Sequence, residues 1–126
     1  MKSIIYTENA PEPIGPYSQA VQTGNLLFIS GQIPVDPKSN QLVGGTIIDE
    51  AKQVMKNLEA LLFKAGFSFE DVVKTTIFLR DMNYFAEVNE VYGSYFHAEF
   101  PARETVAVLG LPKNVNVEIS LIASKT

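Results

Sequence analysis

The sequence has 126 residues, 46% of them hydrophobic and 19% charged, which predicts one globular domain spanning residues 1–126. Its formal net charge of −4 and the absence of any lysine or arginine run argue against a nucleic-acid-binding surface. The chain has no cysteine, no apolar segment of roughly 18 residues and no signal-peptide pattern, so we expect a cytoplasmic protein without disulfides or membrane spans.

Strands joined by turns are predicted for the first part of the chain. Residues 2–7 contain several β-branched side chains and fit an edge strand, and the three prolines of residues 8–16 prevent its continuation. Two apolar runs, 19–23 and 26–30, flank Gly24-Asn25. This arrangement predicts a β-hairpin with a two-residue turn.

The second strand of this hairpin ends in Ser30-Gly31-Gln32. A glycine at this point permits a bulge or the close approach of a ligand to the backbone. A plain strand end is an equally good interpretation of the same glycine. Residues 33–45 follow as a turn-rich loop.

Helix and strand alternate in the middle of the chain. Thr46, with Asp49 three residues later, predicts an N-cap, and Gly66 predicts the end of a helix whose apolar stripe faces the core. Residues 72–80 are rich in β-branched and aromatic side chains and form the strongest strand candidate of the sequence.

A second helix is predicted to begin after a cap at Asp81 or Asn83. Asn89 lies at the edge of its buried stripe, where an asparagine is usually solvated but can also meet a pocket. The single histidine, His97, is expected at the end of this helix. One histidine without cysteine excludes a His/Cys zinc cluster, and no metal site is predicted. The buried stripe consists of Phe85, Val88, Tyr92 and Phe96.

Two strands, 101–109 and 115–124, are predicted on either side of a breaker segment at residues 110–114. Glu118 lies on the more polar face of the second strand. If the two strands pair, Arg103 and Glu118 line one pocket as a fixed cation and a carboxylate. The alternative is a surface ion pair between them, worth roughly 0–1 kcal/mol.

The predicted order is strand, two hairpin strands, helix, strand, helix and two strands. It indicates an α+β fold in which one mixed β-sheet carries both helices on one face. The other face would hold apolar side chains such as Val106 and Ile122. An apolar open face usually marks an oligomer interface.

Five segments of the chain carry a family resemblance. They are IGPYSQA (14–20), FISGQIP (28–34), VVKTTIFLRDMNYFAEVNEVY (72–92), FPAR (100–103) and LPKNVNVEIS (111–120). Together they resemble the RidA/YjgF family of reactive intermediate deaminases, also called the endoribonuclease L-PSP family, over essentially the whole chain. The resemblance implies a chorismate-mutase-like (YjgF-like) fold, a homotrimer with a central barrel, and active sites in the clefts between subunits.

The activity implied by this resemblance is the hydrolysis of 2-imino acids and their enamine tautomers to 2-keto acids and ammonia. Substrates of this kind are 2-iminobutanoate and 2-iminopropanoate, which arise from pyridoxal-phosphate enzymes. We expect no cofactor, because a protonated imine is already a strong electrophile. The expected partners are small 2-imino or 2-keto acids and further copies of the chain, with no nucleic acid and no membrane.

The resemblance also assigns site residues. The family arginine falls on Arg103, which would bind the substrate carboxylate, and the family glutamate falls on Glu118, which would activate water. Thr105 and Glu104 depart from the family, in which many members have cysteine and serine there. Thr105 is expected to face the pocket and to influence substrate preference, whereas Glu104 should point away from Arg103. Positions that line the family pocket fall on Tyr17, Ser30, Gly31 and Asn89.

Two other functions are alternatives to this activity. A regulatory trimer that binds small carboxylates without turnover would need only Arg103, so the presence of Glu118 favours an enzyme. A ribonuclease or translation inhibitor is disfavoured by the acidic net charge and by the absence of a basic stripe.

Overall fold

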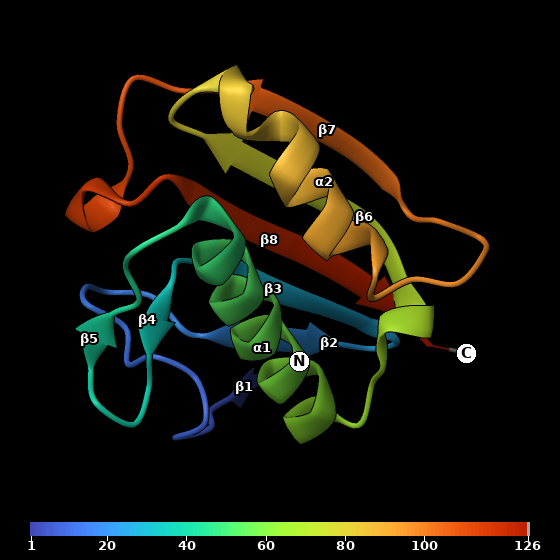
Figure 1. The fold of residues 1–126 in the computed structure, drawn as a ribbon. Coiled ribbons are helices and arrows are strands. Elements are labelled where there is room, and N and C mark those ends of the chain that lie inside the picture. The colour runs from blue at the N-terminus through green and yellow to red at the C-terminus, as the bar shows by residue number, and fades with distance from the viewer. Residues whose placement is uncertain (126) are drawn as a thin grey trace.

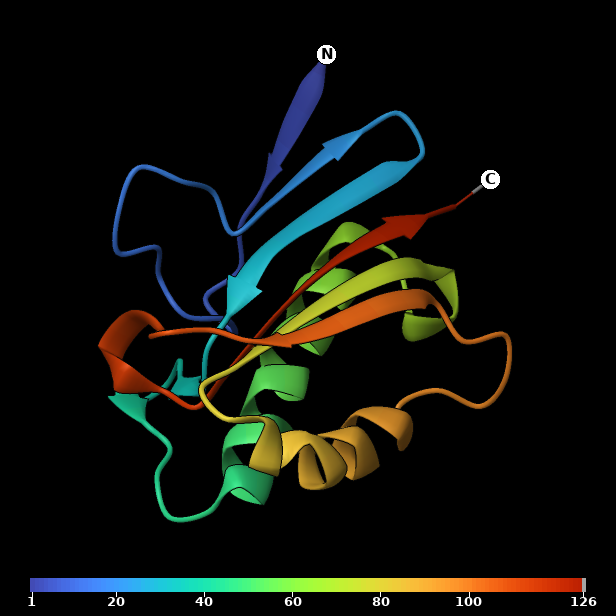
Figure 2. The same ribbon diagram turned by 90° about the horizontal axis from the view of Figure 1, so that it is seen from above.

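The computed structural model describes residues 1–125, which form a six-stranded mixed sheet with two helices on one face (Figures 1 and 2). The strands lie in the order β1-β2-β3-β8-β6-β7, and only β6 and β7 of the described sheet run parallel. The predicted α+β class is therefore confirmed. The strands are β1 (Lys2–Ile5), β2 (Ala20–Thr23), β3 (Leu26–Gln32), β6 (Val72–Leu79), β7 (Ala102–Ala107) and β8 (Val117–Ser124).

The remaining elements are two helices, a small hairpin and short 3₁₀ turns. Helix α1 spans Ile47–Ala65 and helix α2 spans Phe85–Gly93. Within residues 1–125, neither helix is long and apolar enough to cross a membrane. The hairpin, β4 (Val35–Asp36) with β5 (Gln41–Leu42), lies inside the predicted 33–45 loop, and the turns are η1 (Phe69–Asp71), η2 (Met82–Tyr84) and η3 (Pro112–Asn114).

Both predicted ends of α1 are confirmed. Thr46 is the N-cap, and its side-chain oxygen accepts a hydrogen bond from the backbone N–H of Asp49 at 3.1 Å. Gly66 follows the helix in the left-handed conformation, at φ 83°, and its N–H bonds to carbonyls of the last turn. Glycine adopts this conformation without the steric cost that a Cβ would bring.

Helix α2 begins at Phe85, the first residue of its predicted apolar stripe, but ends earlier than that stripe predicted. Asp81 caps the short turn η2, which leads directly into the helix. The helix ends at Gly93, so His97 lies four residues beyond it and is exposed, rather than at the helix end. Phe96 is buried in spite of lying outside the helix, because its ring packs against Tyr92 and Phe69.

The β2–β3 hairpin is confirmed, with Thr23 opposite Leu26 across Gly24-Asn25. Strand β3 continues to Gln32, two residues farther than predicted. Its register with β8 shifts between Ile29 and Gln32, so Ser30 and Gly31 lie at a β-bulge.

The last two strands do not pair with each other, so the condition for a pocket shared by Arg103 and Glu118 within one chain is not met. Strand β6 lies between β7 and β8, pairing parallel with β7 and antiparallel with β8. The parallel pair is possible because α2 connects β6 to β7 and returns the chain to the same end of the sheet (Figure 1). As a consequence, Arg103 lies opposite Thr75 of β6, and not opposite a residue of β8.

The two faces of the sheet have different surroundings. Val117, Ile119 and Leu121 of β8 belong to the core cluster shared with α1, and each is at most 3% exposed. The alternate residues of β8 lie on the other face, which neither helix covers (Figure 2). Phe28 and Val106 are 41% and 44% exposed on this open face, as predicted for Val106.

Candidate functional site

Arg103 lies on the helix face of β7, in contact with α2. Its Nη1 donates a hydrogen bond to Oδ1 of Asn89 at 2.6 Å. The guanidinium carbon lies 5.1 Å from the ring centre of Tyr92 and 5.6 Å from that of Phe85, within the range of cation–π attraction. Arg103 and Asn89 also line a surface pocket with Phe100 and Pro101. A partly desolvated, planar cation at a pocket is suited to bind a carboxylate.

Glu118 lies on the open face of β8, half-buried against the bulge of β3. Burial raises the pKa of its carboxyl above the ordinary value of 4.5. A carboxylate with a raised pKa is closer to the proton affinity that a general acid or base needs near neutral pH. The pocket around it is lined by Ile14, Tyr17, Ser30, Gly31, Ile33, Pro112 and Glu118.

The bulge places Gly31 directly under the carboxyl group of Glu118. A Cβ built on Gly31 would lie 2.7 Å from the carboxyl carbon of Glu118 and nearer still to one of its oxygens. The bulge that this glycine permits is therefore present, and the group that approaches its backbone is a side chain of the same chain. The close approach of a ligand stays a prediction. Ser30 is fixed beside it, with Oγ donating to the carbonyl of Ser18 at 2.6 Å.

Replacing Gly31 with alanine is expected to lower kcat roughly 10- to 100-fold with little loss of folded protein. The added methyl group must displace the Glu118 carboxyl, the group expected from the sequence to activate water, and small misplacements of such a group are costly. The backbone of Gly31 is not left-handed, so alanine adds no conformational strain there. Gly44→Ala is the matched control, because nothing lies within 4 Å of its added Cβ. If Gly31→Ala and Gly44→Ala have the same kcat, the space that Gly31 leaves for the Glu118 carboxyl does not matter for turnover.

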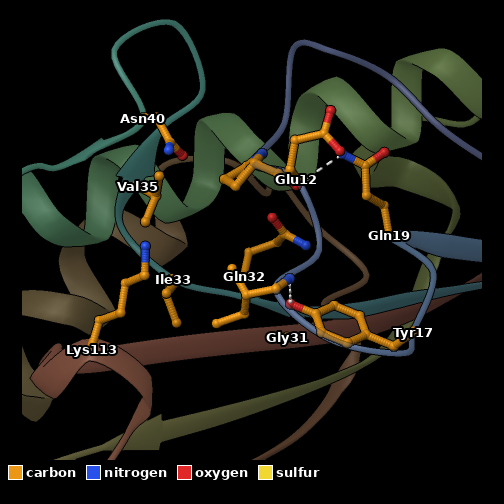
Figure 3. Close-up of a pocket in the computed structure, with 11 residues that line it drawn as sticks. Glu12, Tyr17, Gln19, Gly31, Gln32, Ile33, Val35, Asn40 and Lys113 are labelled. Carbon is orange, nitrogen blue, oxygen red and sulfur yellow. Dashed lines mark hydrogen bonds between the residues drawn. The ribbon is translucent and has the colours of Figure 1, made fainter.

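Tyr17 reaches the Glu118 side of the sheet on the proline-rich loop. Its hydroxyl accepts a hydrogen bond from the N–H of Ile14 at 3.3 Å, drawn as a dashed line in Figure 3. Sequence reasoning missed the residue that holds this loop, Gln19, which is 2% exposed. Its side chain bonds to both the N–H and the carbonyl of Thr7 and to the carbonyls of Ala10 and Pro11. Gln19 lies two residues after Tyr17 in the segment IGPYSQA, and this position is the sequence signal that could have identified it.

Thr105 lies on β7 two residues from Arg103 and is not among the residues that line either pocket. Its hydroxyl oxygen is buried and has no hydrogen-bond partner within residues 1–125. Glu104 points to the open face as predicted, where it forms an ion pair with Lys74 at 3.1 Å and accepts a hydrogen bond from Thr76. A role for Thr105 in substrate preference stays a prediction.

A single chain does not bring Arg103 and Glu118 together. Glu118 and Val106 both lie opposite Phe78 of β6, on the open face, whereas Arg103 lies opposite Thr75, on the helix face. The expected shared pocket and the alternative ion pair are therefore both wrong for one chain. The structure instead has two half-sites: an arginine half-site around Arg103 and Asn89, and a glutamate half-site that includes Tyr17, Ser30, Gly31 and Glu118.

Comparison with known proteins gives a consistent result. The family model described as endoribonuclease L-PSP matches residues 7–125. A RutC family protein of Pyrococcus horikoshii is 56% identical over 125 residues, which cover 99% of both chains. The 2-iminobutanoate/2-iminopropanoate deaminase of Mus musculus is 50% identical over 123 residues, covering 98% of this chain and 91% of the mouse protein. The crystal structure of E. coli TdcF with bound serine has a TM-score of 0.94 at 42% identity, covering 98% of this chain and 99% of TdcF.

Proposed function

Because this chain belongs to the endoribonuclease L-PSP family, also known as RidA/YjgF, we propose that it hydrolyses reactive 2-imino acids and their enamine tautomers. The products would be 2-keto acids and ammonia, with 2-iminobutanoate and 2-iminopropanoate as substrates. The observation that carries this proposal is the pair of complementary half-sites, a partly desolvated arginine and a half-buried glutamate with a raised pKa. The family predicted from the sequence motifs is confirmed.

We propose further that the two half-sites meet across an interface between copies of the chain, in a homotrimer with a central barrel. Arg103 and Glu118 lie on opposite faces of one sheet, so a cleft containing both requires a second copy. The open face is partly apolar, with Phe28 and Val106 more than 40% exposed, and such a face favours association.

The proposed reaction needs only water as co-substrate. Arg103 binds the carboxylate of the imino acid and fixes the position of its C=N carbon. Glu118 takes a proton from a water molecule, whose oxygen attacks this carbon to form a carbinolamine. Glu118 then gives this proton to the nitrogen of the carbinolamine. As the C–N bond breaks and ammonia leaves, the Glu118 carboxylate takes the proton of the carbinolamine hydroxyl, so that the C=O bond of the keto acid forms, and Glu118 then releases this proton to the solvent or to the ammonia. An acid/base group in this position contributes roughly 10²–10⁴-fold to the rate.

A coupled assay tests the activity directly. A threonine dehydratase generates 2-iminobutanoate in the presence of semicarbazide, which traps the imine. The wild-type protein should suppress semicarbazone formation and accelerate the release of 2-ketobutanoate, whereas the Arg103→Ala variant should do neither. Identical semicarbazone formation with wild type and variant would refute the deaminase proposal.

The assembly is tested by mixing two inactive variants. Arg103→Ala and Glu118→Gln chains, co-expressed in equal amounts, should recover about one quarter of the wild-type activity, because random assortment leaves about one site in four with both residues intact. Each variant assembled alone should remain inactive and serves as the control. A mixture that stays inactive while sedimenting as mixed oligomers would show that the two half-sites do not share a cleft.

A second candidate function is a trimer that binds small carboxylates without turnover. It is supported by the serine bound to TdcF and by the archaeal relative, whose name states a family and no activity. This candidate predicts that 2-ketobutanoate binds with an affinity that depends on Arg103, while imine hydrolysis stays at the uncatalysed rate. Binding and turnover measured on the same sample distinguish the two functions.

A further inference from the structure

We propose that Tyr92, fixed by Thr75, is a positioning residue that sets the plane of the Arg103 guanidinium for carboxylate binding. This inference rests on the proposed function, because it describes how the carboxylate-binding arginine is oriented. The sequence pattern assigns no functional role to Tyr92 or Thr75. It predicts only that Tyr92 is a buried residue of the second helix.

Three elements meet at this arginine. Arg103 on β7 lies opposite Thr75 on β6, and Tyr92 comes from α2. The Tyr92 hydroxyl and Oγ1 of Thr75 are 2.8 Å apart in a buried hydrogen bond. Thr75 is 1% exposed and Tyr92 is 5% exposed, so the bond is shielded from competing water. The same tyrosine ring lies 5.1 Å from the guanidinium carbon.

This arrangement determines how the tyrosine ring can turn. A buried hydroxyl that loses its partner carries a desolvation penalty, so the hydrogen bond to Thr75 restricts the ring orientation. The pKa of Tyr92 is raised, mainly by burial, which keeps the phenol protonated and able to make this bond. Because the guanidinium lies over that ring, the ring orientation is passed on to the arginine.

The remaining contacts of Arg103 leave part of the guanidinium available. Nη1 is used by Asn89, and the ring of Phe85 lies 5.6 Å from the guanidinium carbon. A guanidinium has five N–H groups in a planar fork. With the plane fixed by aromatic neighbours and one edge held by Asn89, the donors that remain can bind a carboxylate without first losing rotational freedom.

The test compares variants that disturb the ring orientation without removing the arginine. Tyr92→Phe and Thr75→Val each delete one hydroxyl, and we expect KM to rise roughly 3- to 10-fold with kcat within about twofold of wild type. The double variant should have nearly the same KM as either single variant, because both remove one hydrogen bond. Tyr92→Leu, which removes the ring, should raise KM more than Tyr92→Phe.

Tyr95→Phe is the matched control, because this tyrosine is also on the helix side but packs against Phe69 and not against Arg103. It should leave KM unchanged. A purely structural role for Tyr92 would lower the thermal midpoint or the active fraction, and therefore kcat, without changing KM. That result would overturn the proposal. The proposal would also fail if the KM increases of the two single variants multiplied in the double variant, because the two hydroxyls would then act independently.

A binding measurement separates this inference from the proposed function. The dissociation constant of 2-ketobutanoate, measured by calorimetry, should rise by the same factor as KM in Tyr92→Phe and Thr75→Val. If wild type shows no imine turnover but binds 2-ketobutanoate, the deaminase proposal fails and the dissociation constants alone decide the role of Tyr92. Unchanged dissociation constants in both variants would refute the positioning role.

Discussion

Glu118→Gln is expected to lower kcat roughly 10²–10⁴-fold with KM changed little. Glutamine has nearly the same shape and can occupy the same space above Gly31, but it cannot accept or return a proton at neutral pH. The change leaves the guanidinium of Arg103 in place and keeps the shape of the residue at position 118, so binding of the substrate carboxylate should persist. Steady-state kinetics in the threonine dehydratase assay separate the two constants.

The pH dependence of turnover is a second test of the Glu118→Gln variant. Because burial raises the pKa of Glu118, the loss of base activity on acidification should begin above the pH at which an ordinary glutamate titrates, and this acidic limb should be absent in Glu118→Gln. Because its pKa is raised, the Glu118 carboxyl binds its proton more tightly in the folded state than in the unfolded state. The contribution of Glu118 to the free energy of unfolding therefore falls as the pH rises from 4.5 through the raised pKa. Glu118→Gln should therefore be neutral or slightly stabilising at pH 7.

The control is Glu59→Gln, the same change at an exposed position on α1. Its kinetics and pH profile should match those of the wild type. If Glu118→Gln retains wild-type kcat, another group performs the proton transfers, and the glutamate half-site is only a binding surface.

Arg103→Ala is expected to raise KM roughly 10²–10³-fold, or to abolish measurable turnover. The substitution removes the charged partner of the substrate carboxylate together with the cation that lies over Tyr92 and Phe85. Arg103→Lys should retain part of the affinity, because an ammonium keeps the charge but cannot form the planar two-bond contact. The measurements are KM in the coupled assay and the dissociation constant of 2-ketobutanoate.

Lys64→Ala is the control for this experiment, because it removes a positive charge from the exposed last turn of α1 and Lys64 lines neither half-site. It should leave KM unchanged, since an exposed charge that lines neither half-site is largely screened by salt. An Arg103→Ala variant that folds, assembles and keeps the wild-type KM would show that the substrate carboxylate binds elsewhere.

Much of the fold could be predicted because its signals are local. The cap at Thr46, the left-handed Gly66 and the turn at Gly24-Asn25 each depend on a few neighbouring residues, and all were predicted correctly. The alternation along residues 115–124 likewise fixed which face of the strand is buried, since Val117 and Ile119 are in the core and Glu118 is not. Short-range periodicity is sufficient for these features.

The sequence by itself thus determined the main helices and the six strands of the large sheet, the family of this protein and the identity of two candidate catalytic residues, but not the β4–β5 hairpin or the end of α2. Only the tertiary structure decided where those residues lie relative to one another. Strand β6 lies between β7 and β8 and places Arg103 and Glu118 on opposite faces. Strand order follows from pairing between segments far apart in the chain, which no local pattern encodes. Strand β7 lies at the edge of the sheet and has polar and apolar residues on both faces, so its sequence pattern does not predict which face Arg103 occupies. The tertiary structure places Arg103 on the face where α2 packs.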